Sequence, residues 1–562
     1  AVVSCDRECG AEISVDIKKY CETLKYLKKS QIRYLIKNRL TRGKAAVTEA
    51  KAPVRGELAL WMPRLDEHPD YLKRFSLEEL LDGNVTLLHE SGTPSGNGWK
   101  HPDKSHLWNF NLQYLEFLIP LAAAYRETKD EKYYTCFRDY CERWISDNAD
   151  GKGDGWHPYT ISLRLTNLWI CLDGFDGRVQ EDQVFFLKLT DSMYAQYLHL
   201  QKKLELHLLG NHYLENLKAV MLGALYFKEP GIYAEYKSRL QEELKEQILP
   251  DGVHYERSIM YHKIVLEDVM RAAKGVKDAD QLFYQELSAL LQPMTDAMYS
   301  MEEGMGHTPL FNDSGDNVAR SMLSLLAALR EEFSIAPVNK NAFSDAGYYC
   351  LRHQGMKILM DAGEIAPDYM PGHGHCDGLS FEVSVDQHPV FVNSGTGQYQ
   401  GSVRGYFRST RAHNTVVIEG EEQSECWGEH RVAKRISQVS GDCGADWIHG
   451  ELVTATGRQQ KRMILVDDQK VIVKDQVTGS AQAYLHLTPD YEYEEQDGQV
   501  LVKAVDGSVI CRIIPELSDQ IKIHRDGEIC SYAPEFGQIM KIQVLEIAWE
   551  GDGSEHEIQI NW

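Results

Sequence analysis

The sequence predicts an α+β protein of two domains, an incomplete (α/α) helical toroid followed by an antiparallel β-sandwich. Its 562 residues exceed what one hydrophobic core supports, because single cores stop growing at roughly 250 to 300 residues. Apolar residues recur at helical spacing from about residue 15 to 335, and at strand spacing afterwards. We therefore expect a toroid over residues 1–340 and a sandwich over residues 341–562.

The first half has the pattern of helical hairpins separated by turns. Leu112, Leu115 and Leu118 share one helical face, and Leu214, Leu217 and Met221 share another. Glycine-rich or proline-rich breaks punctuate such segments at 148–155, 229–231 and 250–252. About ten helices of 12 to 20 residues fit this pattern. Helical hairpins with short links stack as a solenoid or close into a ring, and the lack of a fixed repeat favours the ring.

The second half has a period of two between Gly, Asp and Asn turns. We expect strands at 348–351, 357–360, 379–385, 390–392, 415–418, 462–466, 471–473, 483–487 and 500–502. Many short strands without intervening helices are typical of an antiparallel sandwich.

Composition excludes several classes of function. The content of hydrophobic residues, 43%, is that of a globular protein, and no apolar run reaches about 18 residues, so we expect no membrane span. A formal charge of −24 argues against general nucleic-acid binding, which needs a basic surface. An anionic partner would have to be received by a local cluster of Arg, Lys and His.

The twelve cysteines lack paired CxxC spacing, and we expect buried thiols. A Cys5/Cys9 or Cys426/Cys443 bridge stays open if the protein is exported.

Three polar segments carry the candidate chemistry. The first, residues 209–218 (LGNHYLENLK), precedes a strongly apolar helix. Helix capping accounts for Asn211 and for Glu215, but it does not explain the neighbouring His212.

The second segment, residues 251–265, enters another helix. Ser258, Tyr261, His262 and Val265 fall on one face of that helix. A tyrosine in such a stripe is commonly a core residue. The many ionisable groups nearby, Glu256 among them, favour a functional site instead.

The third segment, residues 370–381, is a glycine-rich loop that leads into a strand. It contains His373 and His375, and with the distant His413 such imidazoles can hold a divalent metal. A surface turn with incidental histidines is the alternative.

Together these segments resemble the heparinase II/III family of polysaccharide lyases, which combines a helical toroid with an antiparallel β-sandwich. The resemblance covers most of the chain, and seven motifs in the same order carry it. They are residues 107–112 (LWNFNL), 162–169 (SLRLTNLW), 210–216 (GNHYLEN), 251–262, 311–314 (FNDS), 373–375 (HGH) and 407–415 (FRSTRAHNT).

The resemblance implies catalytic roles for four residues and an active cleft between the domains. Asn211 matches the residue that neutralises a uronate carboxylate, and His212 matches a histidine that accepts a proton. Tyr261 matches the catalytic tyrosine, and His373 matches the histidine supplied by the sandwich.

The resemblance also implies a structural divalent metal, zinc or similar, held by His375 and His413. Where family members that bind the metal carry an aspartate, this chain has Asn393. An amide oxygen can coordinate, but without the negative charge zinc affinity should fall.

The implied reaction is β-elimination at a 4-linked uronic acid. Removing the C5 proton puts a second negative charge beside the carboxylate, and that charge must be masked by preorganised hydrogen bonds. Tyr261 would protonate the leaving oxygen and, for glucuronate, could take the C5 proton; for iduronate His212 would be the base. We expect adjacent cations to tune the pKa of Tyr261, because a free phenol with a pKa near 10 is a poor base.

Seven further residues are expected at the substrate. Arginines would meet carboxylates or sulfates, and tryptophans would stack on sugar faces. The expected residues are Trp108, Arg164, Glu215, Glu256, Arg408, Arg411 and Trp427. Ordinary ion pairing or core packing is the alternative for each arginine and tryptophan.

The predicted function is therefore cleavage of an acidic polysaccharide: heparan sulfate, hyaluronan or a chondroitin-type chain, with alginate as an alternative. One rival is a glycoside hydrolase that uses two carboxylates among Glu215, Glu256 and Asp313. Another is a noncatalytic polysaccharide-binding protein on the same fold. We expect a bacterial protein of the periplasm or the medium, with the cytoplasm left open; the oligomeric state is not readable from the sequence.

Overall fold

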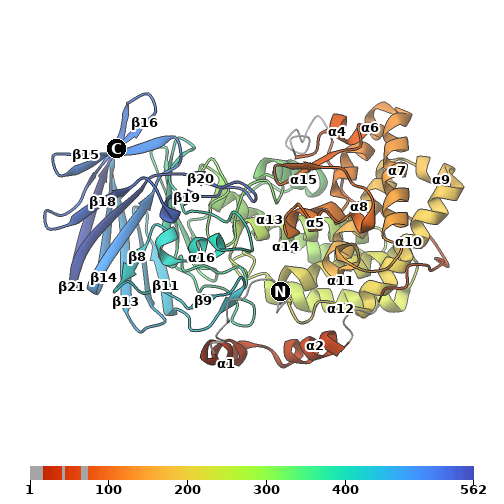
Figure 1. Cartoon of the computed structure of the whole chain (residues 1–562), viewed down its shortest axis with the longest axis horizontal. Coiled ribbons are helices and arrows are strands. Elements are labelled where there is room, and N and C mark those ends of the chain that lie inside the picture. The colour runs from red at the N-terminus through yellow and green to blue at the C-terminus, as the bar shows by residue number, and fades with distance from the viewer. Residues whose placement is uncertain (1–16, 41–44, 65–73) are drawn as a thin grey trace.

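The computed structural model describes residues 17–40, 45–64 and 74–562, and it has the two-part architecture that the sequence predicts (Figure 1). A helical half and a β half lie side by side, and the first two helices run along the underside of both. The last helix of the toroid ends at Phe333, and the first strand of the sandwich begins at Ala342.

Five helices of the toroid pack on one another in chain order. They are α6 (Ile119–Thr128), α8 (Pro158–Gly174), α11 (Gly210–Tyr226), α13 (Ile259–Val276) and α15 (Met322–Phe333). Helices α8, α11 and α13 are buried on nearly every side, and charged residues buried between them pair with one another, as Lys218 does with Asp268.

A second set of helices flanks this inner row and exposes one polar face each. It consists of α7 (Glu131–Asp147), α10 (Gln183–Lys202), α12 (Pro230–Gln247) and α14 (Gln281–Glu302). The shorter helices are α4 (Leu77–Leu81), α5 (His106–Gln113) and α9 (Arg178–Glu181). The small β1 (Val85–Leu87) and β2 (Glu90–Gly92) form a hairpin beside α5.

The first two helices, α1 (Ile17–Tyr26) and α2 (Lys29–Leu40), form an arm that contacts both domains. On the sandwich side, the Trp427 indole donates a hydrogen bond to Thr23 Oγ1 at 3.1 Å. On the toroid side, the buried Gln31 donates to the carbonyl of His207 at 3.5 Å. Sequence periodicity gives no indication of this bridging position.

The sandwich consists of two antiparallel sheets with a shared core. The smaller has the order β3-β4-β5-β6-β7, and the larger has the order β11-β12-β13-β14-β21-β17-β16-β15, with β8 on β14 and β18 on β21. Side chains from both, such as Phe381 and Ile464, meet in one apolar cluster.

The bounds of the strands in the smaller sheet are β3 (Ala342–Phe343), β4 (Tyr348–His353), β5 (Met356–Asp361), β6 (Phe381–Val385) and β7 (His388–Phe391). In the larger sheet they are β8 (Val416–Ile418), β11 (Ser437–Cys443), β12 (Trp447–Val453), β13 (Gln459–Asp467), β14 (Lys470–His486), β15 (Tyr491–Gln496), β16 (Gln499–Ala504), β17 (Val509–Ile514), β18 (Gln520–His524) and β21 (Val544–Asn561). Short pieces outside these sheets are β9 (Cys426–Trp427), β10 (Arg431–Val432), β19 (Ser531–Tyr532), β20 (Met540–Lys541) and α16 (Val403–Phe407).

One expectation about the strands is wrong. Residues 471–473 and 483–487 belong to a single strand, β14, which pairs with β21 along its length. Its register shifts between Gln476 and Thr478, and Gly479 has a φ of 102°. A glycine that resembles a turn signal therefore marks an irregularity inside a continuous strand.

The domains meet over a buried apolar seam. Ile259, Met301 and Phe311 from the helical half pack with Tyr348 and Leu359 of the small sheet. This seam places the start of α13 against the loops of the sandwich.

The described cysteines follow the main expectation of free thiols. Every cysteine in the described residues is unbridged, and Cys426 lies beside Cys376, with 3.7 Å between the sulfur atoms, rather than beside Cys443. Cys5 and Cys9 lie outside the described residues. No helix within the described ranges has both the length and the apolarity to cross a membrane.

Candidate active site

Tyr261 lies in the first turn of α13, where a serine cap fixes it. Ser258 Oγ accepts a hydrogen bond from the Tyr261 backbone N–H at 3.3 Å and donates one to the carbonyl of Asp313 at 2.7 Å. Ser258 thus ties the helix start to the segment that carries Asp313. The Tyr261 residue is 8% exposed.

Tyr261 meets two side chains of the sandwich. Its ring centroid lies 4.2 Å from that of His373, and its hydroxyl is 2.6 Å from the Tyr399 hydroxyl. A phenol from the toroid and an imidazole from the sandwich therefore share one site, as the proposed chemistry requires.

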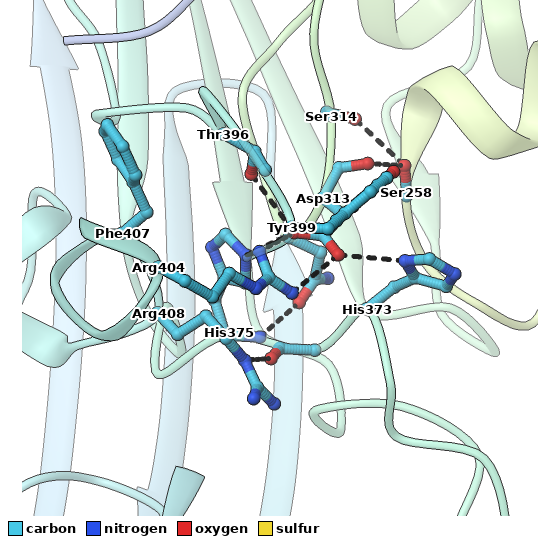
Figure 2. A network of polar contacts seen from close by, with 12 residues as sticks. Ser258, Asp313, Ser314, His373, His375, Thr396, Tyr399, Arg404, Phe407 and Arg408 are labelled. Carbon is cyan, nitrogen blue, oxygen red and sulfur yellow. Dashed lines mark hydrogen bonds and ion pairs between the residues drawn. The ribbon is translucent and has the colours of Figure 1, made fainter. Parts of the chain in front are cut away.

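Asp313 is the centre of a buried polar network (Figure 2). Its carboxylate accepts hydrogen bonds from His373 Nδ1 at 2.8 Å, His375 Nε2 at 2.8 Å and Thr396 Oγ1 at 3.1 Å. Both terminal nitrogens of the Arg404 guanidinium also donate to it. A fully buried carboxylate is tolerated only with such partners.

The network fixes the orientation of His373. Burial would raise the pKa of Asp313, but the Arg404 guanidinium and the hydrogen bonds from His373 and His375 hold it well below its usual range. An ionised carboxylate can only accept, so Nδ1 of His373 carries a proton. Nε2 is the nitrogen left for a substrate, and it lies 3.7 Å from Glu256 Oε2.

Asn211 also contacts Glu256, and its hydrogen-bond donors are both used by that carboxylate. Its backbone N–H and its side-chain nitrogen both donate to the Glu256 carboxylate, at 2.9 and 3.0 Å. The side-chain oxygen of Asn211, Oδ1, is buried without a hydrogen-bond partner, but it can only accept. In this arrangement Asn211 holds Glu256, and its expected contact with a substrate carboxylate stays a prediction. Glu256 is 1% exposed and holds Asn211 instead of facing a sugar.

The surroundings of Tyr261 also differ from expectation. Burial raises its pKa well above the ordinary value, and the neighbouring Tyr399 phenol and Asp313 carboxylate raise it further. We expected adjacent cations to lower this pKa. The phenol is instead kept protonated, which suits a proton donor.

His212 lies in the first turn of α11 and keeps 29% of its side chain exposed. The Tyr159 ring stacks on it with 4.1 Å between centroids, and Glu205 Oε1 is 3.1 Å from its Nδ1. The sequence did not draw attention to Glu205.

Three residues expected at the substrate are core residues. Trp108 is fully buried, and its indole donates to the Glu90 carbonyl at 2.9 Å. Arg164 is fully buried and donates to two backbone carbonyls and to a glutamine side chain. Glu215 is fully buried and accepts from Lys218 Nζ at 2.9 Å. None of the three offers an exposed surface to a sugar.

The other three expected residues also have structural partners. Arg408 is buried, and its Nε donates to the Gly374 carbonyl at 3.0 Å, which supports the loop between the two histidines. Arg411 is exposed and pairs with Glu528 at 3.0 Å. The Trp427 indole packs edge-on against Tyr20 of α1 at 4.6 Å between ring centroids. Burial corrects the expected substrate contact for Arg408, whereas for Arg411 and Trp427 that contact stays a prediction.

A candidate metal site lies behind His373. His375, Asp377 and His413 each offer a ligand atom, and these atoms lie within 4.8 Å of one another. Nδ1 of both histidines is buried without a hydrogen-bond partner. Each Nε2 has a partner, Asp313 for His375 and the Phe407 carbonyl for His413, as in metal sites where a second contact orients the ligand. These residues fit a divalent metal.

Asn393 makes hydrogen bonds within the protein on both atoms of its amide. Its Oδ1 accepts from the Asn414 backbone N–H at 3.1 Å, and its Nδ2 donates to Ser380. Asp377 provides a carboxylate instead, and burial raises its pKa to about 6. Asp377 therefore joins His375 and His413 as a candidate ligand, and Asn393 as a ligand stays a prediction.

Sequence reasoning missed Tyr399, Glu205, Arg404 and Asp377 as members of the site. One local signal could have indicated Tyr399, because it follows the glycine-rich turn at residues 395–397. For Asp313 the sequence predicts a role only under the hydrolase alternative.

Comparisons with known proteins agree with this architecture. A crystal structure of heparinase III superposes with a TM-score of 0.65 at 18% sequence identity, covering 94% of this chain and 88% of that one. A heparan sulfate lyase from Pedobacter heparinus superposes with a TM-score of 0.58 at 17% identity, covering 97% of this chain and 88% of that one. At these identities the likeness shows the fold alone.

Sequence relatives include two proteins named heparin-sulfate lyase. The one from Pedobacter heparinus is 22% identical over 358 residues, which is 58% of this chain and 53% of the relative. The one from Bacteroides thetaiotaomicron is 23% identical over 402 residues, which is 61% of this chain and 57% of the relative. The match spans little more than half of each relative.

Family models account for most of the chain. The model of the heparinase II/III N-terminus matches residues 92–341, and the heparinase II/III-like C-terminal model matches residues 336–562. The two halves of one family thus follow each other in this sequence, and the chain belongs to the heparinase II/III family.

Proposed function

We propose that the protein is a polysaccharide lyase that cleaves uronic-acid polysaccharides by β-elimination. The proposal depends on one observation: Tyr261 and His373 come from different domains and lie in contact. The Tyr261 hydroxyl is also hydrogen-bonded to the Tyr399 hydroxyl. The names of the sequence relatives, heparin-sulfate lyase, add support from outside the site.

The geometry suggests how the roles are divided. His373, held by Asp313 and protonated at both ring nitrogens, donates from Nε2 to the uronate carboxylate and masks the charge that develops when C5 loses its proton. His212 accepts that proton. Tyr261, which its surroundings keep protonated, donates to the leaving oxygen on C4. An unsaturated uronate and a new chain end result.

A glycoside hydrolase on this fold is a weaker candidate. Such an enzyme needs two carboxyl groups flanking a glycosidic bond. Glu215, Glu256 and Asp313 are all at most 1% exposed, and each is committed to partners in the protein.

The substrate class follows from the site only in part. We propose heparan sulfate first, because of the names of the relatives, with hyaluronan and chondroitin-type chains next and alginate as the alternative. Polymers of this kind do not cross membranes unaided, so we propose that the protein acts outside the cytoplasm of a bacterium.

The test is incubation with a panel of these four polysaccharides, with ultraviolet absorbance of the new double bond as the readout. Tyr261→Phe should lower kcat by about 100-fold or more, because general acid catalysis contributes roughly 10² to 10⁴. Release of saturated sugars only would favour the hydrolase. Binding without any cleavage, unchanged by Tyr261→Phe, would favour a noncatalytic binding protein.

We also propose that His375, Asp377 and His413 hold a divalent metal of the zinc class. When bound, such an ion would anchor the loop that carries His373 without touching the substrate. The test is metal content after dialysis against zinc, and absorbance of a cobalt-substituted sample. Asp377→Asn should lower the affinity for zinc by about tenfold or more, because a charged ligand is lost. Equal metal content in both proteins would contradict this ligand set.

A further inference from the structure

A buried acid lies directly behind His212. Glu205 belongs to the segment between α10 and α11 and is 1% exposed. Its Oε1 is 3.1 Å from His212 Nδ1, and its Oε2 accepts a hydrogen bond from Asn216 Nδ2 at 3.1 Å. The Glu205 backbone N–H donates to Asn216 Oδ1 at 2.8 Å. Asn216 therefore clamps both the backbone and the carboxylate of Glu205.

The same segment sets the start of α11. Leu209, the residue before the helix, has a φ of 65° and a ψ of −150°, a conformation that is strained for a leucine. Its N–H donates to the Glu205 carbonyl at 3.0 Å. The backbone of Glu205 thus holds the strained turn that brings His212 to the site, while its side chain contacts the imidazole.

Two further side chains contact the pair formed by Glu205 and His212. His157 Nε2 lies 3.8 Å from the same Glu205 oxygen, and Tyr159 stacks on the His212 ring. Burial would raise the pKa of Glu205, but the neighbouring His212 and His157 imidazoles and the hydrogen bonds from His212 and Asn216 lower it to about 2. Glu205 is therefore ionised at every pH at which the protein would be assayed.

An ionised carboxylate can only accept a hydrogen bond, so it selects the tautomer of its partner. His212 then carries its proton on Nδ1 and presents the lone pair of Nε2. A carboxylate behind a histidine base works in this way in hydrolytic triads, where it orients the imidazole and stabilises the cation formed on proton transfer.

We infer that Glu205 is a positioning residue for the proposed elimination and that it makes His212 the proton acceptor. The inference rests on the proposed function and adds a residue that acts through His212 without touching the sugar. It also explains how one site separates its two proton transfers: Tyr261, next to Tyr399 and near Asp313, is kept as an acid, and His212 on Glu205 is kept as a base.

The experiment compares wild type with Glu205→Gln on heparan sulfate. The variant keeps the shape of the side chain and removes its charge. We expect kcat to fall about 100-fold with KM within threefold, within the range of general-base contributions. The protonated imidazole loses the carboxylate that stabilises it, so the acidic limb of kcat/KM should also move to lower pH. A purely structural role would not move that limb.

Three further comparisons sharpen the result. Glu546→Gln makes the same change at another histidine–glutamate contact, that with His524 at 2.7 Å in the sandwich, and should leave the kinetics unchanged. Glu205→Asp should restore the acidic limb, because it returns a carboxylate, and it serves if Glu205→Gln folds poorly. In a His212→Gln background, Glu205→Gln should cause little further loss, because the two residues act as a unit.

A Glu205→Gln protein with kcat within threefold of wild type and an unmoved acidic limb would overturn the inference while leaving the lyase proposal intact. So would full additivity with His212→Gln. If wild type produces no unsaturated product from any polysaccharide of the panel, the proposed function fails, and this inference fails with it.

Discussion

Replacing Asp313 by asparagine should destabilise the sandwich strongly. The variant keeps the volume of the side chain but removes the only charge that faces the Arg404 guanidinium within its network, and it introduces a donor among donors. Arg404 is 1% exposed. Leaving one member of such a buried pair uncompensated costs about 3 to 5 kcal/mol, whereas an exposed pair contributes about 0 to 1 kcal/mol.

The assay is urea unfolding followed by tryptophan fluorescence. With a slope of about 3 kcal/mol per molar urea, a loss of this size lowers the midpoint by about 1 to 1.7 M. The control is Glu528→Gln, which removes the partner of the exposed Arg411. Asp313→Asn combined with Arg404→Gln should recover part of the loss, because both charges are then gone. A midpoint shift no larger than that of the control would refute the reasoning.

Three other predictions concern the site and its surroundings. Tyr399→Phe should lower kcat about tenfold with little change in KM, because Tyr261 loses its buried hydroxyl partner; equal kinetics would remove Tyr399 from the site. Burial lowers the pKa of His254 and of His262 to about 4 each, below the ordinary value of 6.5, so their contribution to stability is present above pH 6.5 and is lost as the pH falls toward 4. The urea midpoint should therefore fall between pH 7 and pH 5, and a constant midpoint would contradict this. Asn393→Asp should change zinc affinity less than threefold, because the oxygen at that position accepts from the Asn414 backbone; a tenfold gain by dialysis would place residue 393 among the ligands.

The sequence was a good guide to the architecture because periodicity is a local property. The helical spacing around Leu214 and Leu217 reflects the buried faces of α11, and the alternation at 462–466 reflects one inward face of β13. The failure at β14 has the same origin, since a glycine within a strand and a glycine in a turn look alike in a local pattern.

Site residues could be predicted from the sequence only where they stand in a motif that resembles the family. Tyr261 and His373 were found in this way, and they meet. Glu205 and Tyr399 were missed because their meaning comes from contacts made in the folded chain, and the Tyr399 contact spans 138 positions.

Burial was the second source of error. Arg164 belongs to a family-like motif, but no sequence pattern shows that its guanidinium is enclosed by the Gln113 and Gly155 carbonyls. Arginine in a motif therefore gave a wrong substrate contact, while the acid that orders the site, Asp313, was weighed for a different reaction.

The arm formed by α1 and α2 ties the two domains together from outside. Arg435 of the sandwich lies over the Tyr26 ring at 3.9 Å, and Lys28 lies over the Tyr369 ring at 3.8 Å while pairing with Glu246 of α12. Any hinge motion that moved Tyr261 away from His373 would have to break these contacts. Residues 17–40 therefore restrain opening of the two domains, and deleting them should weaken binding of the proposed polysaccharide before it harms the folding of either domain.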